Sequence, residues 1–209
     1  MNKLKYYLPT IAVSLASIIT AILYILLKDN YIIGNIFIIV SAIPVSLIIP
    51  IFSLIIKKEI PISLNVMLTI LAYVALSLGT GIRMYDFVSC WDTICHTYFG
   101  FFICFYFYFI FGRLINYKNR ALYLIVCFFF ISTIAILWEF IEFTFDFITG
   151  DDSQKVQESL DNGHAGTFDT MIDILVAYLG YLVYLILYLI DFKKFKLHNF
   201  LCKKDFFLF

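Results

Sequence analysis

Three carboxylates stand close together near the end of a long apolar run, at Glu139, Glu142 and Asp146. Phe, Ile and Thr separate them, and no basic residue lies between them. If the run is helical, about 100° per residue places all three within a wedge of roughly 60°. Ionisable groups inside a membrane span are costly, and they usually face the interior of a helix bundle or a water-filled cavity. The three acids therefore predict a polar site that other spans complete.

The composition indicates a membrane protein. Hydrophobic residues make up 63% of the 209 residues and charged residues only 14%, whereas about a quarter of a soluble domain is charged. Lys and Arg balance Asp and Glu, so the net charge is zero and we expect no nucleic-acid partner. The sequence predicts an all-α, polytopic helical bundle whose natural partners include membrane lipids.

Six apolar runs predict six transmembrane helices, at about 6–27, 31–56, 61–78, 92–111, 121–148 and 169–190. The first run is too long for a signal peptide and is interpreted as an uncleaved span. Pro44 and Pro50 predict a kink in the second span, and Pro61 suits the first turn of the third. We expect one transmembrane domain over residues 1–192, followed by a basic, partly apolar tail over 193–209.

Basic residues are unevenly distributed between the two sides of the predicted membrane. One side holds Lys3, Lys5, Lys57, Lys58, Arg113, Lys118, Arg120, Lys193, Lys194, Lys196, Lys203 and Lys204, and the other holds Lys28, Arg83 and Lys155. Because cytoplasmic connections carry the excess of Lys and Arg, both termini are predicted to be cytoplasmic. The three acids of the fifth span then lie toward the outer side.

Two other spans begin on that outer side with acids of their own. Asp92 and His96 start the fourth span, and Asp169 and Asp173 start the sixth, each pair at the i, i+4 spacing that shares a helix face. Small residues continue these faces, at Gly100, Ala177 and Gly180, and would let the helices approach closely. The sequence therefore predicts that three helices bring acids and one histidine to a common depth.

Several carboxylates in a low-dielectric site need protons, an arginine or a bound cation to neutralise them. Oxygen ligands favour Mg, Ca or Mn, and histidine with carboxylates also suits Zn or Fe. The candidate metal ligands are Asp92, His96, Glu139, Glu142, Asp169 and Asp173. Of these, Glu139, Glu142 and His96 are candidates for catalysis, while Arg83 and Asp146 are candidates for substrate binding.

Each candidate also has a structural interpretation. His96 is at least as well explained as a hydrogen-bonded structural histidine, and Asp92 and Asp169 as helix N-caps. Cys90 and Cys95 lie close enough in sequence for a disulfide or a soft metal site, although two free thiols are the simpler expectation. The acids of the loop at 149–168 are expected to be solvated, with a turn at 161–163.

The ordered set of these motifs resembles a known family. The chain is similar to the YjdF-like bacterial membrane proteins in this order of motifs: Asp92-x-x-x-His96-x-x-x-Gly100, then Trp138-Glu139-x-x-Glu142, then Gly163 to Gly166 leading into Asp169-Thr170-Met171-x-Asp173 and Gly180. A remoter resemblance is to the VanZ-like proteins. Ala177 departs from the pattern, because some relatives are expected to carry an acid there. The resemblance implies a multi-pass α-helical protein of the bacterial plasma membrane and supplies no established reaction.

Three hypotheses for the function follow. In the first, the outer cluster binds a divalent cation together with a lipid head group or an envelope precursor, and a transfer or hydrolysis takes place there. In the second, the protein is a small proton- or cation-coupled transporter, although the chain shows no internal repeat. In the third, it is a non-enzymatic membrane factor that binds an envelope component or a partner protein.

Overall fold

A computed structural model describes residues 3–27, 33–57, 60–111 and 119–193. The described residues form helices joined by turns, and no strand occurs among them. They fall into two compact units, residues 3–95 with 191–193 and residues 96–190, and each unit is described separately. The predicted tail beyond Lys193 lies outside the described residues, and the prediction of a single transmembrane domain stays a prediction.

Six helical segments within the described residues are long and apolar enough to cross a membrane, which confirms the predicted class. They are Tyr7–Leu27, Asn35–Ile56, Ile62–Gly81, Trp91–Phe111, Arg120–Thr149 and Phe168–Ile190. The predicted boundaries agree with these to within a few residues. The protein is therefore a multi-pass, all-α membrane protein.

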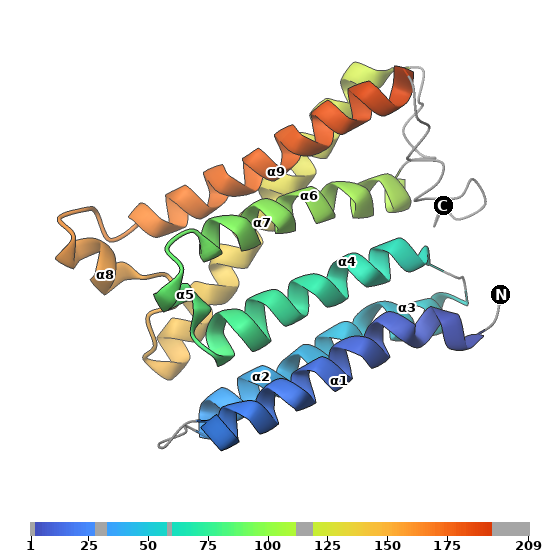
Figure 1. Cartoon of the computed structure of the whole chain (residues 1–209). Helices are drawn as coiled ribbons and strands as arrows, with labels where there is room; N and C mark the ends of the chain where they lie inside the picture. The colour runs from blue at the N-terminus through green and yellow to red at the C-terminus, as the bar shows by residue number, and fades with distance from the viewer. Residues whose placement is uncertain (1–2, 28–32, 58–59, 112–118, 194–209) are drawn as a thin grey trace. The chain divides into compact units, whose positions relative to one another are not determined.

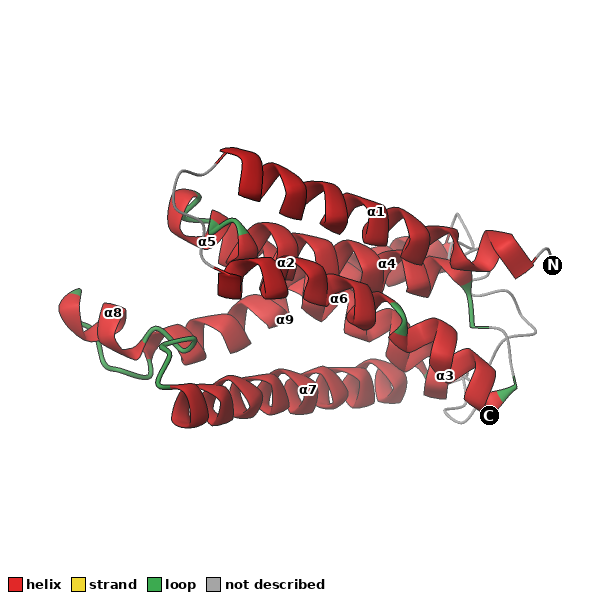
Figure 2. Ribbon diagram, turned by 90° about the horizontal axis from the view of Figure 1, so that it is seen from below, coloured by secondary structure: helices red, strands yellow, loops and turns green. Residues whose placement is uncertain are grey.

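Helices α1 (Lys3–Leu27), α2 (Ile33–Ser46), α3 (Ile48–Ile56) and α4 (Ile62–Ala72) make up most of the first unit. In Figures 1 and 2, α1, α2 and α4 run side by side. Small polar groups join α1 and α2 to the helical segment that continues α4. The Ser17 and Ser77 hydroxyls lie 3.1 Å apart, and Ser77 donates to the Ile39 carbonyl at 2.7 Å. Such short side chains allow close packing where lipid supplies no hydrophobic driving force.

The second span breaks at Leu47, between α2 and α3, near the two prolines that predicted a kink. Pro50 has no N–H and cannot donate to the carbonyl of Ser46, four residues earlier. Thr10 of α1 supplies a donor instead, and its hydroxyl lies 3.0 Å from that carbonyl oxygen. The interrupted helix is thus stabilised by its neighbour.

The third span begins as an α-helix and ends as a π-helix. Helix α4 follows Pro61, which serves as its N-cap, and continues as a π-helix over Tyr73–Gly81, three residues beyond the predicted end. The Trp91 indole donates to the carbonyl of Val74 in this segment at 3.2 Å. The connection that follows contains the short helix α5 (Met84–Phe87).

The second unit is built from α6 (Trp91–Phe111, of which residues 96–111 belong to this unit), α7 (Arg120–Thr149) and α9 (Phe168–Lys193), with the short α8 (Val156–Asp161). The buried residues of α7 recur at every fourth position: Tyr123, Cys127, Ile131, Ala135 and Glu139. This spacing keeps them on one face of the helix. A carboxylate thus occupies the last position of an otherwise apolar or weakly polar buried stripe.

Aromatic side chains hold α7 and α9 together away from the acids. The hydroxyls of Tyr123 and Tyr184 lie 2.6 Å apart in the interior, and Tyr181 donates to the carbonyl of Leu124 at 3.0 Å. Phe105 of α6 packs edge-on against Tyr184, with 5.2 Å between ring centroids. Satisfied hydroxyls allow tyrosine to be buried in a membrane bundle without the cost of an orphaned polar group.

Helices α6 and α9 approach each other at the predicted small residues. A Cβ atom at Gly100 would overlap the carbonyl oxygen of Ala177, and one at Gly180 would overlap that of Thr97. The absence of a side chain at both glycines therefore permits backbone-to-backbone packing next to His96.

Candidate functional site

Glu139 is the deepest acid of α7. Only 6% of its surface is exposed, and its Oε2 atom has no hydrogen-bond partner among the described residues. A buried carboxylate oxygen normally accepts hydrogen bonds or pairs with a positive charge, because its desolvation is otherwise uncompensated. A proton or a cation bound at Glu139 would compensate for the desolvation of its carboxylate.

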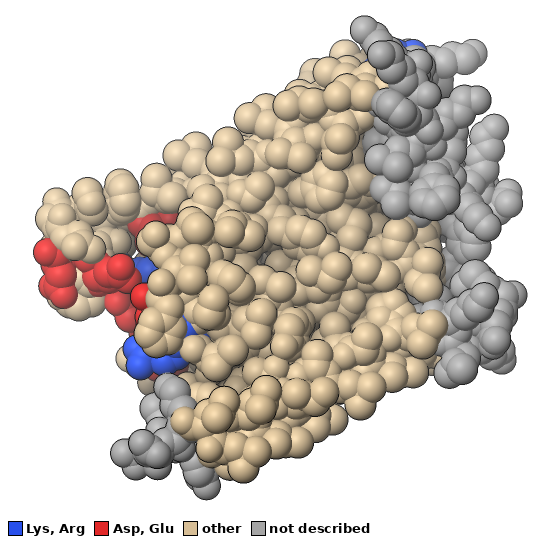
Figure 3. Space-filling view, viewed as in Figure 1, with Lys and Arg blue, Asp and Glu red and all other residues tan. Residues whose placement is uncertain are grey.

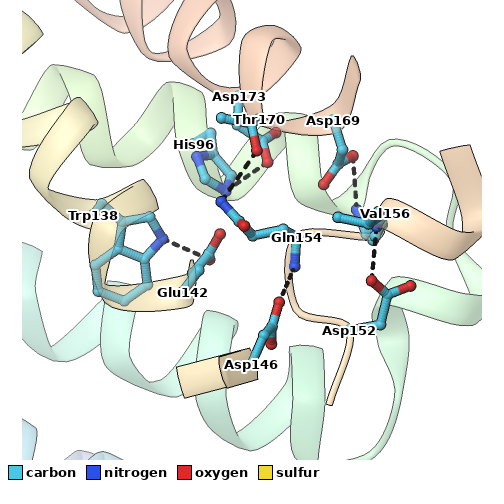
Figure 4. Close-up of polar contacts among 11 residues, drawn as sticks. His96, Trp138, Glu142, Asp146, Asp152, Gln154, Val156, Asp169, Thr170 and Asp173 are labelled. Carbon is cyan, nitrogen blue, oxygen red and sulfur yellow. Dashed lines mark hydrogen bonds and ion pairs between the residues drawn. The ribbon is translucent and has the colours of Figure 1, made fainter. Parts of the chain in front are cut away.

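Glu142 lies three residues further along the same helix and is half-buried. Its Oε1 accepts a hydrogen bond of 2.7 Å from the indole Nε1 of Trp138, drawn in Figure 4. The Trp138 ring in turn packs against Phe99 of α6, with 5.9 Å between centroids. The indole, which contacts α6 through Phe99, therefore favours one orientation of this carboxylate.

Asp173 of α9 lies close to His96 and to the two glutamates of α7. Its Oδ2 lies 3.6 Å from Nε2 of His96 on α6, and both side chains are nearly buried. Glu139, Glu142 and Asp173 each present a carboxylate oxygen within 4.8 Å of the others, a spacing from which one cation could be held. Four of the predicted site residues, on three helices, thus come together within the second unit.

Asp146 is directed at the loop that follows α7. Its two carboxylate oxygens accept the backbone N–H groups of Ser153 and Gln154, at 2.8 and 3.0 Å. These bonds fold the chain back over the end of its own helix. The carboxylate has a structural role here, and its predicted contact with a substrate stays a prediction.

Gln154 joins α7 to α9 beside Glu139. Its side-chain amide donates to the backbone carbonyl of Glu139 at 3.3 Å and to the Thr170 hydroxyl at 3.2 Å. Figure 4 shows it between the acids of the two helices. Sequence reasoning missed this residue, because a glutamine in a polar loop carries no signal of such a contact.

Asp169 forms an ion pair with Lys155, with 3.3 Å between Oδ1 and Nζ. Lys155 has a positive φ of 47° immediately before α8. This left-handed conformation is uncommon outside glycine and favours a specific loop geometry. Asp169 was predicted to be a metal ligand or a helix cap, and beside its ion pair with Lys155 both roles stay predictions.

The two remaining site predictions lie in the first unit. Asp92 stands one helical turn before His96 on the continuous helix α6, so that both residues share a face as predicted. Arg83 forms an ion pair with Asp86, three residues along the chain. The roles of Asp92 as a ligand and of Arg83 in substrate binding stay predictions.

The two cysteines and the acids of the loop agree with the simpler expectations, which were free thiols and exposed carboxylates. Cys90 and Cys95 are both free thiols. Asp151, Asp152, Glu158 and Asp161 are exposed, and in the face shown in Figure 3 acidic side chains gather beside α8. The expected turn forms, with Gly163 at a φ of 78°.

Comparison with known families supplies a classification. The family described as "Predicted membrane protein (DUF2238)" matches residues 10–194, which is most of the chain. The protein belongs to the DUF2238 family. The YjdF family is the same family, so this part of the predicted resemblance is confirmed. Neither the curated proteins nor the solved structures searched contain a match. Membership in DUF2238 establishes a membrane protein and assigns no reaction to the four converging residues.

Proposed function

We propose that this DUF2238 protein binds a divalent cation at Glu139, Glu142 and Asp173, with His96 beside them. The observation that carries the proposal is the unpartnered, buried Oε2 of Glu139. Its carboxylate and two others offer oxygens within 4.8 Å of one another. Three negative charges this close in a buried site repel one another strongly, and a divalent cation offsets that repulsion.

The proposed site opens to the outer side of the bacterial plasma membrane. The excess of Lys and Arg in alternate connections supports cytoplasmic termini, and α7 then runs from the inside to the outside. Glu139 and Glu142 lie in the second half of that helix. The remoter likeness to VanZ-like proteins agrees with a histidine early in one span and acids in later ones.

A lipid head group or an envelope precursor is the proposed second ligand. Beside the acids, α7 exposes Phe140, Phe143 and Phe147 over the same two turns. In a bilayer, exposed apolar side chains of this kind face lipid. A cation at the cluster would therefore lie next to lipid molecules near their head groups, where a phosphate oxygen is a suitable additional ligand.

Metal analysis of the purified protein tests the proposal. We expect bound divalent metal in the parent after dialysis against a Mn²⁺ or Zn²⁺ buffer, and a loss of at least tenfold in affinity in Glu139→Gln. Asp161→Asn is the matched control, since Asp161 is an exposed acid at the end of α8. A parent that binds no divalent metal would refute the cation site.

A transporter is the second candidate, and two interrupted spans favour it. The second span breaks at Leu47, and the third ends in a π-helix over Tyr73–Gly81. Discontinuous helices are common at the ion sites of secondary transporters. In proteoliposomes, a cation or proton flux that is abolished by Glu139→Gln and Glu142→Gln would support this function, and unchanged flux would count against it.

A further inference from the structure

Within the second unit, Asp173 is close to two sets of possible metal ligands: His96, and the pair Glu139 and Glu142. Its carboxylate is paired with His96, and it also completes the trio with Glu139 and Glu142. A carboxylate has two oxygen atoms and can bind a different cation with each. Asp173 is therefore the one residue of the cluster that both sets share.

The distance between His96 and Asp173 fits ligands of a common ion better than it fits a hydrogen bond. A charge-assisted N–H···O bond spans about 2.7–2.9 Å, whereas these two atoms are 3.6 Å apart. Two ligand atoms at about 2.1 Å from one zinc-like ion, at a tetrahedral angle, would be about 3.4 Å apart. The distance is thus compatible with His96 and Asp173 as neighbouring ligands of one ion.

Charge balance also accommodates a second cation. Asp169 is compensated by Lys155, and the Asp146 carboxylate is bound by two backbone N–H groups. Glu139, Glu142 and Asp173 still contribute three negative charges when ionised. One divalent cation leaves a net charge of minus one unless His96 or one of the acids is protonated, whereas two divalent cations with a bridging hydroxide give zero with a neutral imidazole. A low-dielectric environment favours the neutral assembly.

We infer that the cluster is a dinuclear metal centre in which Asp173 bridges two divalent cations. One cation is held by His96 with one oxygen of Asp173, and the other by Glu139 and Glu142 with the second oxygen. Paired metals on facing helices, bound by carboxylates and histidine, are a known use of helix bundles. This inference rests on the proposed cation site and adds a second metal and a ligand for it.

Metal stoichiometry tests the inference on the full-length protein in detergent. Saturation with Mn²⁺, followed by removal of free metal and elemental analysis, is expected to give two Mn per chain. His96→Ala is expected to give one Mn per chain. The cation beside His96 would then keep only one of its two protein ligands, the oxygen of Asp173. Asp151→Asn, which removes an exposed loop acid, is expected to retain two.

Electron paramagnetic resonance on the parent provides a second readout that needs no variant. Two Mn²⁺ ions bridged by Asp173 are expected to give the broad, many-line spectrum of an exchange-coupled pair, in place of the six lines of an isolated ion. One Mn per chain, or a six-line spectrum at saturation, would overturn the dinuclear centre and leave the proposed single-cation site standing. No bound Mn would overturn both, and two Mn in His96→Ala would overturn the assignment of that ligand.

Discussion

Gly100 of α6 lies directly against the backbone of Ala177 of α9, so that even a methyl group at position 100 would overlap the Ala177 carbonyl oxygen. This contact sets the spacing of the two helices that carry His96 and Asp173. We predict that Gly100→Val lowers the free energy of unfolding by about 1–3 kcal/mol, the usual cost of overpacking. It should also weaken metal binding, because the two ligands move apart.

Thermal unfolding in detergent and metal titration of the same samples check this prediction. Ile94→Ala, on an exposed position of the same helix, is the control and is expected to change neither measurement by much. A Gly100→Val protein with parental stability and parental metal affinity would show that the close contact does not position the ligands.

Trp138→Phe keeps an aromatic ring against Phe99 and removes the N–H donor to Glu142. Partners that orient metal ligands typically contribute about 10–100-fold to metal affinity. We therefore predict a loss of about tenfold in affinity with an almost unchanged melting temperature. Isothermal titration with Mn²⁺ measures the affinity, and an unaltered dissociation constant would show that the indole does not hold Glu142 in place.

The tyrosine pair inside the second unit allows a double-mutant test. Either Tyr123→Phe or Tyr184→Phe leaves one buried hydroxyl without its 2.6 Å partner, at a cost of about 1–3 kcal/mol. The double variant removes both hydroxyls, so we predict that it costs less than the sum of the single variants. Denaturant unfolding measures the free energy of unfolding of the three variants. A loss in the double variant equal to the sum of the two single losses would argue against a direct bond between the hydroxyls.

A second coupled pair tests the broken span. Thr10→Val removes the donor to the Ser46 carbonyl and should destabilise the protein by about 0.5–1.5 kcal/mol. In a Pro50→Ala background, residue 50 regains an N–H that can donate to the Ser46 carbonyl. Thr10→Val should therefore lower the free energy of unfolding by much less in that background. Equal costs in the two backgrounds would show that Thr10 does not compensate for the proline.

The fold was largely predictable because apolar length alone determines membrane spans. Each predicted span overlaps an observed one, and even the interruption near Leu47 follows from two prolines. The third span is longer than predicted, because the apolar run was expected to end at about residue 78, just before Gly79 and Gly81. The structure instead includes both glycines in a π-helix, where Gly81 packs against Ile39 and Gly79 against Tyr85.

The site was predictable only where helix periodicity applies. The i, i+3 and i, i+4 spacings placed Glu139, Glu142, His96 and Asp173 on inward faces, and these four converge. Asp146 shares the predicted face but is bound by the backbone of residues 153–154. Loops have no such periodicity, so the contacts of Gln154 and Lys155 could not be read from the sequence.

The π-helix at Tyr73–Gly81 has a consequence for comparing this chain with its relatives. A π-turn holds about one residue more than an α-turn, so the segment behaves as an insertion within the span. A relative with one residue fewer there would have a regular α-helix, and its residues beyond the deletion would keep the same faces, because the π-turn absorbs the extra residue. Alignments of DUF2238 sequences should therefore admit a one-residue gap at this point, even inside a transmembrane helix.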